Sequence, residues 1–133
     1  MGKLIFMKNC IVIIFSLLSF CKIHDRSQCD IIEKIITDKK VEQFLHRELD
    51  TRKTLYVVNN ELCDNLDTLI KNQKVVTINK NRISSNDNYI EIRSIKKNDS
   101  GMEIFIDYSI EGATFIVKVD NTNKITGIKI VEK

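Results

Sequence analysis

The apolar positions of the chain follow two different periods, and the change between them falls near Tyr89. Before Tyr89, apolar residues recur at the three- and four-residue spacing of amphipathic helices. After it, they alternate with polar residues, which is typical of strands with one buried face. The sequence therefore predicts helices first and a sheet afterwards. The helical positions are Ile31, Ile32, Ile35, Ile36, Val41, Phe44, Leu45 and Leu49.

Asp38 separates the helical positions into two sets. Aspartate is a preferred N-cap residue, because its carboxylate accepts hydrogen bonds from the free amides of a helix's first turn. We therefore predict a second helix that begins near Lys39. One long helix with a kink is the alternative.

The middle of the chain mixes strand and helix signals. Residues 55–58 and 74–78 are rich in β-branched and aromatic side chains and predict two short strands. Residues 61–71 return to a helical period and predict a third, short helix. Residues 79–88 form a polar cluster that predicts a surface loop. The helical period of 61–71 is carried by Leu62, Leu66, Leu69 and Ile70.

Four alternating segments follow Tyr89, and the connections between them are short. They carry turn residues at 97–101, at Glu111-Gly112 and at 121–123. Strands joined so tightly must be antiparallel, because a parallel pair needs a crossover of about a dozen residues. The predicted fold is α+β: N-terminal helices packed on a curved antiparallel sheet that ends in a four-stranded meander.

The first twenty residues have the layout of an export signal. Lys3 and Lys8 form a positive start, and the apolar run from Ile11 to Leu18 follows. This run is shorter than the roughly 20 residues that cross a bilayer, although a retained transmembrane anchor is an alternative. The predicted organisation is a signal over 1–20, a lipidation site and tether over 21–27, and a single domain over 28–133.

Cys21 stands where a bacterial lipoprotein signal places its acylated cysteine. The segment Leu18-Ser19-Phe20-Cys21 resembles a lipobox, with Phe20 in place of the usual small residue. Several acyl chains anchor a protein stably, whereas one chain alone is marginal. We therefore expect a lipid-anchored protein of the periplasm or outer membrane. A cleaved and secreted soluble protein is the alternative.

Cys29 and Cys63 are the two cysteines left in the predicted domain. An even pair in a small exported domain favours a disulfide. Two buried free thiols that act as small apolar side chains are the alternative.

The charge and motif content excludes several classes of function. The formal net charge is +3, and loss of Lys3 and Lys8 with the signal leaves the domain nearly neutral, so no nucleic-acid partner is expected. We find no catalytic motif, no phosphate-binding loop and no cofactor motif. His24 and His46 belong to no recognisable set of metal ligands.

Two pairs of carboxylates are candidates for ligand binding. Asp64 and Asp67 are three residues apart in the predicted third helix, where a solvated surface is the simpler interpretation. Glu103 and Asp107 share one face of a predicted strand, with Phe105 between them. If this face turned towards the helices, it would place two acids in a pocket. If the opposite face turned inward, its apolar residues would fill that space.

The order of these elements resembles the NTF2-like and cystatin-like α+β folds. The lipobox-like leader, the many lysines and asparagines, and the closing segment Ile128-Lys129-Ile130-Val131-Glu132-Lys133 also look like those of small lipoproteins of Bacteroidota. NTF2-like families include pocket enzymes, scaffolds and toxin-immunity proteins, so the resemblance implies no single function.

Three functions are consistent with these patterns, and the third is a structural lipoprotein that only occupies the envelope. The first is a non-enzymatic envelope domain, secreted or lipid-anchored, that binds another protein as an inhibitor or immunity factor. The alternative is an NTF2-like enzyme or small-ligand carrier with Glu103 and Asp107 in an acidic pocket.

Overall fold

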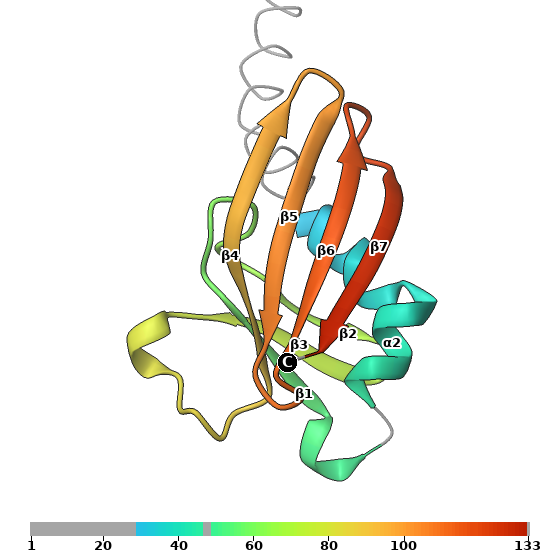
Figure 1. The fold of residues 1–133 in the computed structure, drawn as a ribbon. Helices are drawn as coiled ribbons and strands as arrows, with labels where there is room; N and C mark the ends of the chain where they lie inside the picture. Colours follow the sequence, from blue (N-terminus) through green and yellow to red (C-terminus); the bar gives the residue numbers. More distant parts are fainter. Residues whose placement is uncertain (1–28, 47–48, 133) are drawn as a thin grey trace, which may run out of the picture.

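The computed structural model describes residues 29–46 and 49–132, and these residues form a mixed sheet of seven strands and two short helices (Figure 1). The strand order is β2-β3-β1-β4-β5-β6-β7. The predicted signal, Cys21 and the tether lie outside the described residues. The elements after the first helix are α2 (Lys39–Leu45), the 3-10 helix η1 (Asp50–Arg52), β1 (Thr54–Val58), β2 (Asp67–Ile70), β3 (Gln73–Ile78), the 3-10 helix η2 (Lys80–Arg82), β4 (Tyr89–Asn98), β5 (Gly101–Tyr108), β6 (Ala113–Asp120) and β7 (Ile125–Glu132).

The two helices meet at Asp38, as predicted. The first covers residues 29–37 of the described chain, and α2 begins at Lys39. The Asp38 carboxylate accepts a hydrogen bond of 2.9 Å from the Lys40 amide, which satisfies a donor that the first helical turn leaves free. The alternative of one long helix is therefore wrong. Figure 1 shows the first helix behind the long strands and α2 beside one end of β7.

Strands β4 to β7 form the predicted antiparallel meander. Each hairpin uses the turn residues that the sequence contains. Asn98 accepts a hydrogen bond from the Ser100 amide, Gly112 adopts a φ of 63°, and Asp120 accepts one from the Thr122 amide. Local turn chemistry therefore accounts for this half of the sheet.

The other half of the sheet departs from the predicted antiparallel arrangement. Strand β1 lies between β3 and β4 and runs parallel to both. Short connections impose antiparallel neighbours, but the chain between β1 and β3 is long enough to include β2, which pairs antiparallel with β3. The sheet is mixed and mostly antiparallel, and the α+β class is confirmed.

The predicted third helix over 61–71 is wrong. The Asn60 side chain accepts hydrogen bonds from the amides of Leu62 and Cys63, which makes a side-chain-stabilised turn in place of a helical start. Leu62 and Leu66, which lie in and just after this turn, are buried in the core. Leu69 lies on β2 and is 71% exposed. The helical spacing therefore came from buried turn residues next to a short edge strand.

The core lies between the helices and one face of the meander. The even-numbered side chains of β5 face inward, with Ile104, Ile106 and Tyr108 fully buried. On β6, the Phe115 ring lies 6.0 Å from the ring centroids of both Tyr108 and Phe44. Side chains from α2 and from two strands therefore fill the space between the layers.

The predicted disulfide between Cys29 and Cys63 is confirmed. The two Cα atoms are 4.7 Å apart, and both side chains are buried. The bond joins the first helix to the turn that follows β1, so it fastens the helical layer to the sheet.

Gly101 is the glycine that the fold requires most. Its φ of 148° is unfavourable for other residues, and a Cβ atom there would overlap the backbone carbonyl of Val119. We expect Gly101→Ala to lower the free energy of unfolding by about 2 kcal/mol, as measured by urea denaturation. Gly127→Ala is the matched control, because a Cβ atom at Gly127 would meet nothing within 4 Å. Equal midpoints for the two variants would contradict this reasoning.

Candidate functional site

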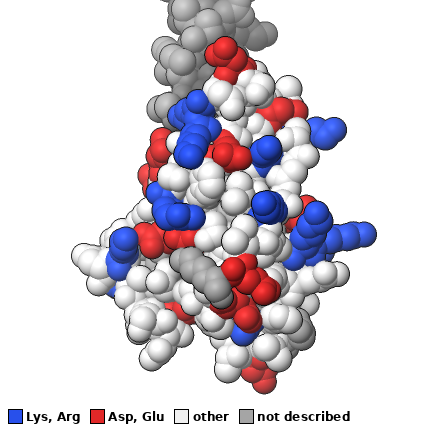
Figure 2. All heavy atoms as spheres, in the orientation of Figure 1, with Lys and Arg blue, Asp and Glu red and all other residues white. Residues whose placement is uncertain are grey.

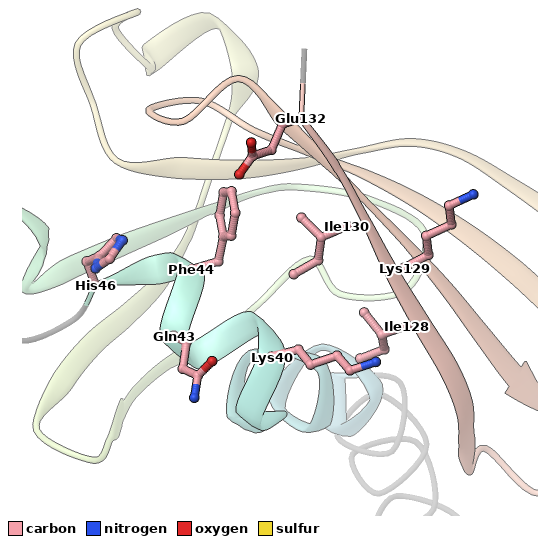
Figure 3. A pocket seen from close by; sticks show the side chains of 8 residues that line it. All are labelled: Lys40, Gln43, Phe44, His46, Ile128, Lys129, Ile130 and Glu132. Carbon is pink, nitrogen blue, oxygen red and sulfur yellow. The ribbon is translucent and has the colours of Figure 1, made fainter.

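A groove with a volume of about 700 Å³ lies between α2 and β7. Figure 3 shows the side chains of α2 and of β7 on its two sides. Because β7 is the last strand of the sheet, the groove runs along an edge of the fold. Its lining residues are Lys40, Gln43, Phe44, His46, Ile128, Lys129, Ile130 and Glu132.

The central part of the groove is apolar. Ile128 and Ile130 point from β7 towards α2, and Phe44 points back from the helix (Figure 3). All three side chains are half-buried and pack against the core. Since the Phe44 ring also meets Phe115 edge-on, the apolar wall is held in place by the core behind it.

Strand β7 offers unpaired backbone groups beside this wall. Among the described residues it pairs only with β6, which leaves its other edge open along Ile125–Glu132. An exposed edge presents N–H and C=O groups that can pair with another chain. The opposite edge strand, β2, is shorter and covers only Asp67–Ile70. The longer edge is therefore the one that borders the groove.

Opposite charges stand at the two ends of the groove. The Lys40 side chain extends beneath Ile128, while Glu132 lies above the Phe44 ring (Figure 3). Within residues 29–46 and 49–132, neither charged group forms an ion pair. His46 ends α2 in the left-handed conformation and lines the groove on the helical side.

Glu103 and Asp107, the predicted ligand-binding acids, lie on the outer face of β5, away from the helices. Glu103 stands between Lys96 and Lys118 on the neighbouring strands. Asp107 forms an ion pair of 3.3 Å with Arg93 and accepts a hydrogen bond of 2.8 Å from Thr114.

Two cations of β4 lie beside Phe105 on this outer face. The Phe105 ring between the two acids has the Lys96 ammonium 5.0 Å and the Arg93 guanidinium 5.8 Å from its centre. Figure 2 shows acidic and basic side chains interspersed over the long strands. The two acids are therefore balanced by nearby cations on an open surface, and their role in ligand binding stays a prediction.

A cluster of buried polar groups joins the ends of several strands. The Tyr108 hydroxyl donates a 2.7 Å hydrogen bond to Asn88, whose side-chain amide donates to the Thr54 carbonyl. Burial raises the pKa of Tyr108 to about 12, despite the opposing effect of Arg52 nearby. Arg52 in turn forms an ion pair of 2.8 Å with Glu111. These contacts stabilise the fold, and the sequence carries no motif that would have revealed the cluster.

The remaining candidates are dispersed. Asp64 lies in a turn and Asp67 begins β2, and both are exposed, so they do not share a helical face. Among the described residues, no group of three or more His, Cys, Asp or Glu side chains is arranged to hold a metal ion. His24 lies outside those residues.

Comparison with known proteins found no match: no family model, curated protein or solved structure matches the chain. In the described part of the chain, no helix has the length and hydropathy needed to cross a membrane. The groove between α2 and β7 therefore stands on its own geometry as the candidate site.

Sequence patterns identified the three apolar residues of the groove as positions in a helix and a strand, but not as parts of a site. Phe44 belonged to a helical stripe, and Ile128 and Ile130 to an alternating strand. Each pattern describes one element, whereas the groove arises because an edge strand lies beside a helix more than eighty residues earlier in the chain. No local signal could have brought the two together.

Proposed function

We propose that this chain is a non-enzymatic, exported domain that binds another protein, and that the groove between α2 and β7 is its binding surface. The observation that carries the proposal is the open edge of β7 beside the apolar wall of Phe44, Ile128 and Ile130. An extended segment that pairs with a sheet edge gains main-chain hydrogen bonds, and adjacent pockets select its side chains. Such a surface suits an inhibitor or an immunity factor.

Export and lipid anchoring are part of the same proposal. The leader and Cys21 support them, and the disulfide between Cys29 and Cys63 is compatible with an oxidising compartment outside the cytoplasm. We place the protein at the periplasmic side of a membrane or at the outer membrane, with secretion as the alternative.

A small-ligand carrier or enzyme of the NTF2-like type has less support. That function needs an open space between helices and sheet with acids in it. Instead, Ile104, Ile106, Tyr108 and Phe115 fill the space, and Glu103 and Asp107 belong to the opposite face of β5.

A site-specific photo-crosslinker tests the binding surface in the cells that produce the protein. We expect a crosslinker at Lys129, one of the residues that line the groove, to form one defined adduct with another protein. A crosslinker at Lys74, exposed on β3, is the matched control and should not form this adduct. Adding Ile130→Thr should remove the adduct, because the change keeps a β-branched residue but makes the wall polar. The same adducts from Lys129 and Lys74, or none, would refute the proposal.

Cys21→Ser tests the anchor. Because the sulfur of Cys21 would carry the lipid, we expect the variant to move from the membrane fraction to the soluble fraction. Mass spectrometry of the mature wild-type protein should show a first residue at Cys21 and the added mass of acyl chains. Unchanged fractionation and an unacylated mass would rule out the lipoprotein signal.

A further inference from the structure

The charges at the two ends of the groove indicate what kind of segment it accepts. Resting on the proposed function, we infer that the groove between α2 and β7 binds an extended segment of a partner protein in which an acidic, an apolar and a basic residue alternate with residues that face away. The acidic residue lies beside Lys40, the apolar residue against Phe44 and Ile130, and the basic residue beside Glu132.

Strand geometry sets the spacing of this pattern. Successive side chains of a strand point to opposite faces, so every second residue of an added strand would face the groove. Ile128, Ile130 and Glu132 are three consecutive positions of this kind on β7. They span about 13 Å at roughly 3.3 Å per residue, so a partner strand places three side chains opposite them.

The charges then assign the outer two positions. Lys40 extends beneath Ile128, at the start of this span, and Glu132 lies at its end (Figure 3). Glu132 is on β7, where an opposite charge directly across an antiparallel pair is favourable and a like charge is unfavourable. Lys40 acts from the neighbouring helix, through the ordinary attraction between unlike charges and repulsion between like charges. The segment must therefore carry its acid at the Lys40 end, and a reversed segment brings like charges together at both ends.

The middle position is apolar for a separate reason. Phe44 and Ile130 are half-buried and already supported by the core, so a polar side chain opposite them would lose water without gaining a hydrogen bond. The apolar residue supplies affinity, while the flanking charges fix the orientation of the segment.

Two synthetic peptides of identical composition test the pattern on the purified domain. One has glutamate, valine and lysine at alternate positions with threonine between them. The other has the glutamate and the lysine exchanged. In both peptides the segment is one strand of the same antiparallel hairpin, and this constraint holds the direction of its chain. By fluorescence anisotropy at low salt, we expect the two affinities to differ about tenfold. The double variant Lys40→Glu with Glu132→Lys should reverse the preference. Lys39→Glu, on α2 but outside the groove, should leave it unchanged.

The outcomes separate this inference from the proposed function. Equal affinities, or no binding by either peptide while the Lys129 adduct still forms, would overturn the charge pattern and leave protein binding in place. Loss of the Lys129 adduct would overturn protein binding itself. A dimer of the isolated domain that Ile130→Thr dissociates in sedimentation would assign the groove to a second copy of the chain and would also overturn the inference.

Discussion

Reduction of the disulfide between Cys29 and Cys63 is expected to lower the free energy of unfolding by about 3 to 4 kcal/mol. The two cysteines are 34 positions apart, and closing a loop of this length restricts the unfolded chain considerably. The bond also fastens the first helix to the turn after β1. For a domain of this size, the loss corresponds to a fall of about 15 to 25 °C in the melting temperature.

Thermal unfolding with and without a reducing agent measures this effect. The reduced protein keeps both sulfur atoms in the core. The difference between the two melting temperatures therefore reports the loss of the covalent bond and not a loss of packed atoms. The matched control is the double variant Cys29→Ala and Cys63→Ala, whose melting temperature should not respond to reductant. If wild-type protein melted at the same temperature in both conditions, the bond would contribute nothing to stability.

Phe115→Ala is expected to destabilise the domain by about 3 to 5 kcal/mol. Phe115 is 1% exposed, and its ring contacts those of Tyr108 on β5 and Phe44 on α2. Removing the ring would leave a cavity between the helical layer and the sheet, and the surrounding side chains could fill it only in part.

Phe105→Ala is the matched control for this change. It deletes the same ring from the neighbouring strand but on the outer face, where Phe105 is half-buried beneath Arg93 and Lys96. There we expect a loss of only about 1 kcal/mol. Urea denaturation of both variants gives the two values. Equal losses would mean that the outer face is packed as tightly as the inner one, contrary to the assignment of the core.

Much of the architecture followed from residue patterns along the chain. The alternation after Tyr89 predicted β4 to β7, and their turn residues predicted the hairpins between them. Asp38 marked the start of α2, and the pair Cys29 and Cys63 suggested the disulfide. The strands, the hairpins and the start of α2 depend on residues that are close in sequence. The disulfide depends on a reaction that only cysteines undergo.

The errors and omissions have a common origin. The segment 61–71 has the spacing of a helix, but the amides of Leu62 and Cys63 donate hydrogen bonds to the Asn60 side chain and residues 67–70 pair with β3, which gives the segment a turn and an edge strand. The groove was not predicted because its two walls come from distant segments. The position of Glu103 and Asp107 also depended on which face of β5 turned inward, and the face that carries these acids also carries the large apolar side chain of Phe105.

Local patterns along this chain were thus sufficient for the α+β class, the meander and the start of α2, because periodicity and turn chemistry act between residues close in sequence. Contacts between distant segments set the parallel pairing of β1, the inward face of β5 and the groove beside β7. The physical reason is that the free energy gained by burying apolar area depends on the packing of the whole chain. It can therefore override the preference of a short segment such as 61–71.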